Sequence, residues 1–263
     1  PLIKPVIICK VLNSAGNTIF TESFKKEEIS IGNCIQIGSL SFNLVKINEP
    51  QKLKLMVSVE NTSIKNSWDF WVYPAKQDVS VGSVLITDKF DKNAEVTLKK
   101  GGSVLLLTYG KVGKEKGAKV AIGFSSIFWN TAWTNNQPPH TLGILCDPRN
   151  PVFKDFPTEY HNNWQLWEPV SHSQAMILDG FPANLKPLIQ PIDTWFENRR
   201  LALAFESKTN GGKLMVCSID LNDVPDDRLV SKQLLYSILR YMNSDQFNPE
   251  AEVDVSKITA LTY

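Results

Sequence analysis

The chain has 263 residues, of which 43% are hydrophobic and 21% charged, and its net charge is +1. This length and composition suit a globular protein of one large or two modest domains. The near-neutral charge offers no broad basic surface for nucleic acid or for an acidic membrane. Since no apolar run reaches the roughly 20 residues that cross a bilayer, we expect no membrane span.

The first 74 residues carry a β pattern. Short β-prone runs such as "VIICKVL" and "LKLMVSVEN" are separated by turn residues, and Pro74 follows the last of them. Closely spaced strands of this kind predict an immunoglobulin-like β-sandwich over residues 1–74. The spacing leaves open whether Cys9 and Cys34 form a disulfide or remain buried thiols.

The pattern changes at residue 75. "NAEVTLKKGGSVLLLTYG" reads as a short helix, a Gly-Gly turn and a fully apolar strand, Ser103 to Leu107. Further on, "RLALAFESKTNGGKLMVCSIDL" reads as a hairpin, and "DDRLVSKQLLYSILRYMNS" as an amphipathic helix capped by Asp226 or Asp227. Continuous apolar strands interleaved with helices predict an α/β domain over residues 75–263, with a mainly parallel sheet.

Few motifs in the chain suggest catalysis or metal binding. The two Gly-Gly pairs lead into strands and do not match a phosphate-binding loop. No nucleophile elbow of the GxSxG type is present, and Cys146 is followed by Asp147 and Pro148, which disfavours that turn. The spacing of His140, His161 and His172 is not that of a metal site. We therefore predict no catalytic residue, no metal and no cofactor.

A pair of acids acting on a glycosidic bond is the catalytic alternative. Such acids need to be close in space and can be far apart in sequence. The candidates for a self-contained hydrolase are Asp147, Asp155, Glu159 and Glu168.

The stretch from residue 125 to 169 holds four of the seven tryptophans, together with many amide side chains. Indole faces suit the C–H faces of sugars, and amides suit their hydroxyl groups. The alternative is structural, since aromatic rings also anchor a long irregular segment onto its own fold. The candidate carbohydrate-binding residues are Trp129, Trp133, Asn135, Asn136, His140, His161, Trp164 and Trp167.

Three stretches carry a family resemblance: "NSWDFWVYP", then "FWNTAWTNNQPPHTLGILCDPRNPVFKDFPTEYHNNWQLWE", then "GGKLMVCSIDL" before the last amphipathic helix. Together they resemble the C-terminal accessory region of bacterial glycoside hydrolases of family 2, the β-galactosidase-like group. The resemblance implies that the second domain has a three-layer, flavodoxin-like fold similar to class I glutamine amidotransferases, without their nucleophile. No catalytic residue carries over, because the chain lacks the length of a catalytic barrel.

The resemblance leads us to expect a non-catalytic piece of a longer polypeptide. Its partners would be the remaining domains of that polypeptide, a carbohydrate ligand, and a second copy through the parent enzyme. It would support the catalytic barrel, oligomer contacts or the edge of the sugar cleft, and it would be exported to the periplasm or beyond. A free-standing carbohydrate-binding module that uses the surface from Trp129 to Trp167 is the main alternative.

Overall fold

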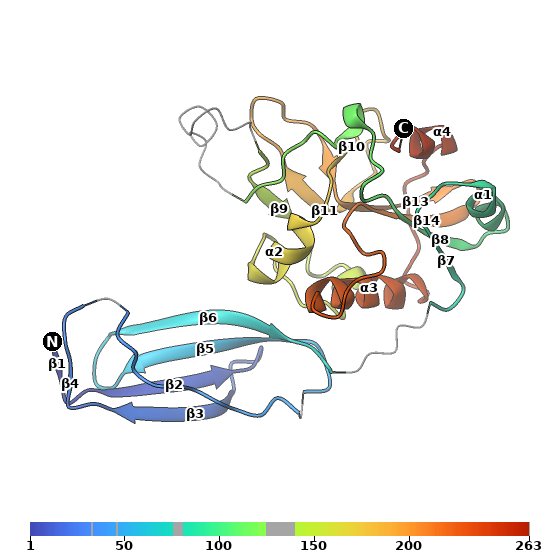
Figure 1. The fold of residues 1–263 in the computed structure, drawn as a ribbon. Helices are drawn as coiled ribbons and strands as arrows, with labels where there is room; N and C mark the ends of the chain where they lie inside the picture. The colour runs from blue at the N-terminus through green and yellow to red at the C-terminus, as the bar shows by residue number, and fades with distance from the viewer. Residues whose placement is uncertain (33, 46, 76–80, 125–139, 263) are drawn as a thin grey trace. The chain divides into compact units, whose positions relative to one another are not determined.

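The computed structural model describes residues 1–32, 34–45, 47–75, 81–124 and 140–262 (Figure 1). The chain divides into two compact units, Pro1–Lys76 and Gln77–Tyr263. The first is built from strands alone in its described part, and the second combines strands with helices. The fold is therefore an all-β unit followed by an α/β unit.

The first unit is organised around one antiparallel sheet. Its strands lie in the order β3-β2-β5-β6, and a two-stranded piece pairs β1 with β4. The bounds are β1 Leu2–Ile3, β2 Val6–Leu12, β3 Thr18–Lys25, β4 Glu28–Ile29, β5 Gln51–Val59 and β6 Lys65–Val72.

One face of this sheet is apolar. Strand β2 alternates, so that Ile7, Cys9 and Val11 are buried on that face together with Leu53 of β5. The segment between β4 and β5 lies over it, where Phe42 stacks on Phe20 with ring centroids 5.2 Å apart. In the described part, an irregular segment therefore covers the apolar face of the sheet. An immunoglobulin-like arrangement of this unit remains a prediction.

The second unit has one large sheet and helices on both sides of it (Figure 1). Its strands are β7 Val84–Thr87, β8 Ser103–Leu107, β9 Gly143–Leu145, β10 Met176–Ile177, β11 Pro187–Ile192, β12 Leu201–Ala202, β13 Ala204–Thr209 and β14 Gly212–Cys217. Its α-helices are α1 Lys92–Lys99, α2 Trp164–Ser171, α3 Leu229–Met242 and α4 Val255–Thr259.

The large sheet has the order β7-β8-β14-β13-β11-β9, and β10 pairs with β12 beside it. Strands β7, β8 and β14 are parallel, whereas β13, β11 and β9 join through antiparallel pairings. The prediction of a mainly parallel sheet therefore holds for one half only. The predicted hairpin is confirmed, because Asn210 and Gly211 connect β13 to β14 with positive φ angles of 54° and 86°.

Strand β8 is covered on both faces, as its apolar run predicts. Val104 and Leu106 pack into one core with Ala94 and Leu98 of α1. Leu105 and Leu107 face the opposite core, which α2 and α3 cover through Leu166, Val170, Leu234, Ile238 and Leu239.

The predicted amphipathic helix is confirmed, but its cap is not an aspartate. Helix α3 begins after Arg228, and Asp226 instead pairs with Lys232. The Glu168 carboxylate of α2 accepts the Ser231 backbone N–H at 3.2 Å, so the cap comes from another helix. The helical pattern places Leu229 on the apolar face of this helix, but its side chain is exposed.

All four cysteines are free thiols, and the Cys9–Cys34 disulfide does not form. Cys9 lies in the apolar face of β2, while Cys34 is exposed. The alternative of buried thiols therefore holds for Cys9, Cys146 and Cys217.

Candidate functional site

Helix α2 presents two tryptophans to solvent. Asn163 caps it, accepting the Leu166 N–H at 3.2 Å, and the helix packs on the core through Leu166 and Val170. Trp164 and Trp167, three residues apart and so on the same side of the helix, are 79% and 53% exposed. The helix therefore packs on the core through smaller apolar side chains and not through these indoles.

The tryptophans form one aromatic cluster with a phenylalanine from another segment. The Trp164 and Trp167 ring centroids lie 6.3 Å apart with planes at 44°. Phe124 stacks on Trp167 at 4.7 Å and 26°. Phe124 was not predicted from the sequence; its only signal was its place beside the tryptophan-rich stretch.

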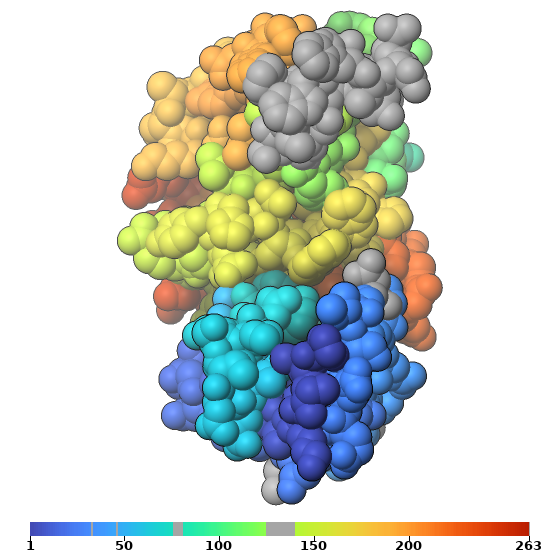
Figure 2. All heavy atoms as spheres, turned by 90° about the vertical axis from the view of Figure 1, so that its left-hand side faces the viewer, coloured from blue at the N-terminus to red at the C-terminus, as the bar shows by residue number. Residues whose placement is uncertain are grey.

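A hollow of about 600 Å³ opens beside this cluster. We call it the α2 hollow, and its described lining is Ile122, Gly123, Phe124, His140, Trp167 and Ser171. It combines apolar walls with an imidazole and a hydroxyl group, which is the composition expected of a small-molecule site. Figure 2 shows the face of the unit that carries α2, in yellow.

Backbone pairing sets the position of His140 in the hollow. Residues 121–123 and 140–141 run side by side, because Thr141 N–H donates to Ala121 O at 2.9 Å and Gly123 N–H donates to Thr141 Oγ1 at 2.9 Å. His140 Nδ1 donates to Thr141 O at 2.7 Å, so Nε2 of the neutral ring is an acceptor. A Cβ at Gly123 would lie 2.4 Å from His140 Nδ1, so glycine is required for this approach.

The structure brings three of the predicted residues together, namely His140, Trp164 and Trp167. His161 is exposed, forms an isolated bridge with Leu145, and is not part of the described lining of the hollow. The remaining predicted residues fall outside the described part of the chain: Trp129, Trp133, Asn135 and Asn136.

The four candidate acids are each engaged by a different partner. Asp147 accepts from Arg149 Nη2 at 2.9 Å, and this hydrogen bond lowers the pKa of Asp147. Asp155 lies 3.4 Å from Arg240 Nε, and Glu159 accepts from an asparagine amide at 3.4 Å. Glu168 accepts from Arg228 and from Ser231 Oγ. A general acid in a glycosidase needs a raised pKa and a facing carboxylate.

The carboxyl end of β8 leads into a turn. After the strand, Thr108 to Lys111 form a turn in which Lys111 N–H donates to Thr108 O at 2.9 Å. Gly110 N–H in the same turn donates to Gln174 Oε1 at 2.8 Å, so the strand leads into a turn and not into a strand-to-helix elbow. Burial also raises the pKa of the Cys146 thiol to about 11, which makes it a poor nucleophile near neutrality.

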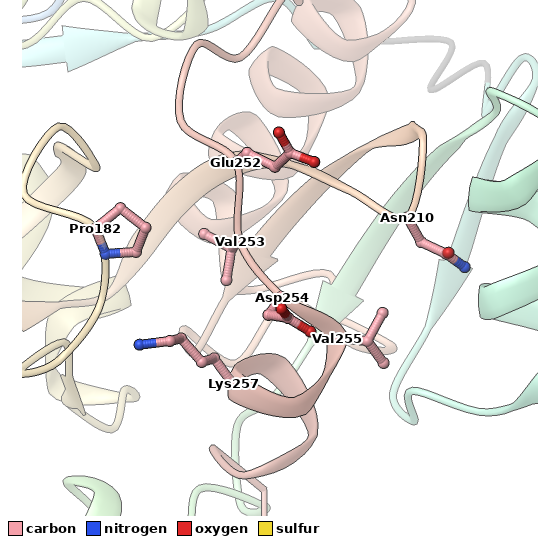
Figure 3. A pocket seen from close by; sticks show the side chains of 7 residues that line it. All are labelled: Pro182, Asn210, Glu252, Val253, Asp254, Val255 and Lys257. Carbon is pink, nitrogen blue, oxygen red and sulfur yellow. The ribbon is translucent and has the colours of Figure 1, made fainter.

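A second hollow of about 430 Å³ lies near α4, between the β13–β14 turn and the segment that carries Pro182 (Figure 3). Its lysine is already engaged, because Lys257 donates to Gly180 O and its ammonium lies over the Phe181 ring. Figure 3 shows Lys257 extending toward Pro182, with Asn210 on the opposite side. The described residues of its lining include no aromatic side chain, so the α2 hollow is the stronger candidate site.

Residues 85–263, well over half of the chain, match a family described as a domain of unknown function, DUF8487. The chain belongs to this family. Residues 1–74 match a second family, described as the domain of unknown function DUF8488. No curated protein matches the chain. The α2 hollow lies wholly within the DUF8487 range, so it is a feature of that domain.

Among the described residues, no helix has the length and apolar character needed to cross a membrane. Within the same residues, no three histidine, cysteine, aspartate or glutamate side chains are grouped as metal ligands.

Proposed function

We propose that the chain is a non-catalytic accessory region of a β-galactosidase-like glycoside hydrolase of family 2, and that its α2 hollow contacts carbohydrate. The observation that carries this proposal is the exposure of Trp164 and Trp167 beside a hollow of about 600 Å³. Large indoles that a fold leaves in solvent, next to a concave surface, are typical of a ligand platform.

The chemistry of the hollow suits a sugar. A pyranose ring has apolar C–H faces, which pack on indole faces, and hydroxyl groups, which need hydrogen-bond partners. Trp164 and Trp167 supply the aromatic surface. His140 supplies an acceptor at Nε2, and Ser171 supplies a hydroxyl group. Stacking gives affinity here, and the polar groups give orientation.

The non-catalytic part of the proposal is supported by the state of the reactive groups. The candidate acids are held by Arg149, Arg240, Asn163 and Arg228, and the Cys146 thiol is buried against Glu159 O. The turn after β8 also leaves no strand-to-helix elbow.

The finer fold assignments and the assembly belong to the same proposal. An amidotransferase-like second unit is supported by the three parallel strands β7, β8 and β14 with helices on both faces. We propose an immunoglobulin-like fold for the first unit on its pattern of closely spaced strands. On the sequence resemblance, we propose that the partners are the remaining domains of a parent polypeptide and a second copy of it, and that the location is the periplasm or beyond.

Affinity electrophoresis in gels that contain galactan, xylan, β-glucan or mannan tests carbohydrate contact. We expect at least one polysaccharide to retard the wild-type chain and to retard a Trp164→Ala/Trp167→Ala double variant less. The matched control is Val96→Ala, which removes an exposed apolar side chain from helix α1. This helix contacts β7 and β8, and β9 forms the opposite edge of the same sheet. Equal migration of wild type and double variant in every gel contradicts carbohydrate contact.

Hydrolysis assays test the non-catalytic part separately. The purified chain is incubated with aryl galactosides, glucosides and xylosides. We expect release of the aryl group at the rate of buffer alone. Turnover at an ordinary enzymatic rate, lost in Glu168→Gln or Asp155→Asn, would show a catalytic carboxylate pair instead.

A further inference from the structure

A second pair of exposed aromatic side chains lies on the connection between β11 and β12. Trp195 and Phe196 are 58% and 66% exposed, and their rings form a T-shaped pair with centroids 6.0 Å apart and planes at 82°. We call residues 193–199 the aromatic tip. In the sequence it reads "DTWFENR", with an aspartate and an arginine on either side of the aromatic pair.

The aromatic tip is closed at its base by one carboxylate. Asp193 is buried and accepts from the Thr194 N–H and the Arg199 N–H, both at 2.8 Å. It also accepts from the Arg199 guanidinium, from Nε at 2.8 Å and from Nη2 at 3.1 Å. Asn198 takes a positive φ of 50° just before the arginine. These bonds hold the loop in one shape, so its rings are presented with little entropy left to lose on binding.

The aromatic tip starts beside the segment that carries His140. Leu142 N–H donates to Ile192 O at 2.8 Å, and Ile192 pairs with Gly143 in the sheet. Trp195 is three residues from this hydrogen bond, and His140 is two. At up to about 3.6 Å per residue, their backbones lie within roughly 25 Å of each other. Figure 2 shows the orange segment of this connection and the yellow helix α2 on the same face of the unit.

We propose that Trp195 and Phe196 form a second saccharide-stacking subsite, and that the ligand is an oligosaccharide chain running from the α2 hollow past His140 to the aromatic tip. This inference rests on the proposed function and specifies its substrate class. A monosaccharide fits one aromatic platform, whereas a chain of several sugars contacts both.

The size of the aromatic tip favours a sugar chain over a protein partner. Two aromatic side chains bury about 150 to 250 Å² each. A stable protein–protein interface buries about 1,200 to 2,000 Å² in total. The tip alone is therefore too small for a stable protein partner, but it matches the face of one or two sugar rings.

Calorimetric titration with length ladders tests the inference. The probes are galacto-, xylo-, cello- and manno-oligosaccharides, each β-1,4-linked and taken from the monosaccharide to the hexasaccharide. For the ladder that binds, we expect affinity to rise with length. In Trp195→Ala and Phe196→Ala, we expect the hexasaccharide to lose about tenfold in affinity and the disaccharide less than twofold. Val96→Ala is the control and should keep wild-type affinity for both lengths.

The outcomes separate this inference from the proposed function. If Trp164→Ala weakens binding at every length while Trp195→Ala weakens it at none, the α2 hollow binds sugar and the second subsite is refuted. If no ladder binds the folded wild-type chain, both proposals fail. If Trp195→Ala weakens the disaccharide as strongly as the hexasaccharide, the tip is not a distal subsite. Thermal unfolding of each variant shows whether its fold is intact.

Discussion

Phe124 stacks on Trp167 with their ring centroids 4.7 Å apart and their planes 26° from parallel. This contact joins helix α2 to the segment before residue 125, and it leaves Trp164 at the outer end of the aromatic cluster. The two tryptophans therefore differ in their surroundings, although they lie on the same side of one helix.

The difference predicts separate effects of two substitutions. Trp164→Ala removes a side chain that is 79% exposed, so we expect the midpoint of thermal unfolding to stay within about 2 °C while saccharide affinity falls. Trp167→Ala also removes the stack with Phe124, so we expect a loss of about 1 kcal/mol in the free energy of unfolding. Denaturant titration and calorimetry measure the two effects. A larger stability loss in Trp164→Ala would contradict this assignment.

Gly123 holds a position that a larger residue would disrupt. In Gly123→Ala the new Cβ would lie 2.4 Å from His140 Nδ1 and 3.0 Å from Thr141 O, so the imidazole has to move. We expect a loss of about 1 to 3 kcal/mol in stability and weaker saccharide binding. The matched control is Gly32→Ala, whose methyl group would meet Ile35 Cδ1 at an ordinary 3.5 Å. Wild-type binding by Gly123→Ala would show that the placement of His140 is unimportant.

Asp193 predicts a pH dependence for the aromatic tip. Burial raises the pKa of this carboxyl, but the hydrogen bonds from Arg199 and Thr194 outweigh it and leave the pKa below its ordinary value. An acid with a lowered folded-state pKa stabilises the fold above its unfolded pKa of about 3.9, and this contribution is lost as pH falls through the folded value. Asp193→Asn should cost about 2 kcal/mol at pH 7.

The cost of Asp193→Asn should shrink in acid as the wild-type carboxyl becomes protonated. Denaturant unfolding of both proteins from pH 7 to pH 2 measures it. A cost that stays constant over this range would mean that the Asp193 charge does not hold the loop.

Glu206 predicts a pH dependence of stability that is opposite in sign to that of Asp193. Desolvation raises the pKa of this carboxyl, the Tyr241 hydroxyl that donates to it at 2.8 Å opposes the rise, and the charge of Glu250 adds to it. A raised folded-state pKa stabilises the fold below the unfolded value of about 4.3, and that stability is lost as pH rises through the folded pKa. Relative to wild type, Glu206→Gln should therefore gain stability between pH 4 and pH 7. If the stability of Glu206→Gln relative to wild type falls as the pH rises from 4 to 7, this sign is contradicted.

The thiols should differ in reactivity because only Cys34 is exposed. Burial raises the pKa of Cys146 to about 11 and that of Cys217 to about 12. At pH 8 their thiolate fractions are therefore roughly a thousandth or less. We expect one cysteine, Cys34, to react fast with a thiol reagent in the native protein, and all four cysteines to react fast in denaturant. Fast native labelling of Cys146, located by mass spectrometry, would contradict the buried environment.

Local sequence patterns predicted the elements that depend on few distant contacts. The apolar run Ser103 to Leu107 is strand β8, covered on both faces, and Asn210-Gly211 makes the turn of a hairpin. The spacing of Leu234, Ile238 and Leu239 identified α3. Each of these signals lies within one element, so the sequence alone contains it.

Features that depend on tertiary contacts could not be predicted. The cap of α3 comes from Glu168, more than 60 positions away, and no local pattern indicates it. The antiparallel edge position of strand β9 follows from its pairing with β11, and no local pattern indicates that pairing. In α2, "WQLW" offers apolar side chains on more than one face; the core takes Leu166, and the tryptophans remain outside.

Fluorine NMR of the chain labelled with 5-fluorotryptophan tests most directly whether the α2 indoles contact carbohydrate. Single Trp→Phe variants assign the resonances of Trp164 and Trp167, and the hexasaccharide that binds best is then titrated in. If the account is right, both resonances move in a saturable way with one dissociation constant. Saturable binding that leaves both resonances unmoved, or no binding of any hexasaccharide, would contradict it.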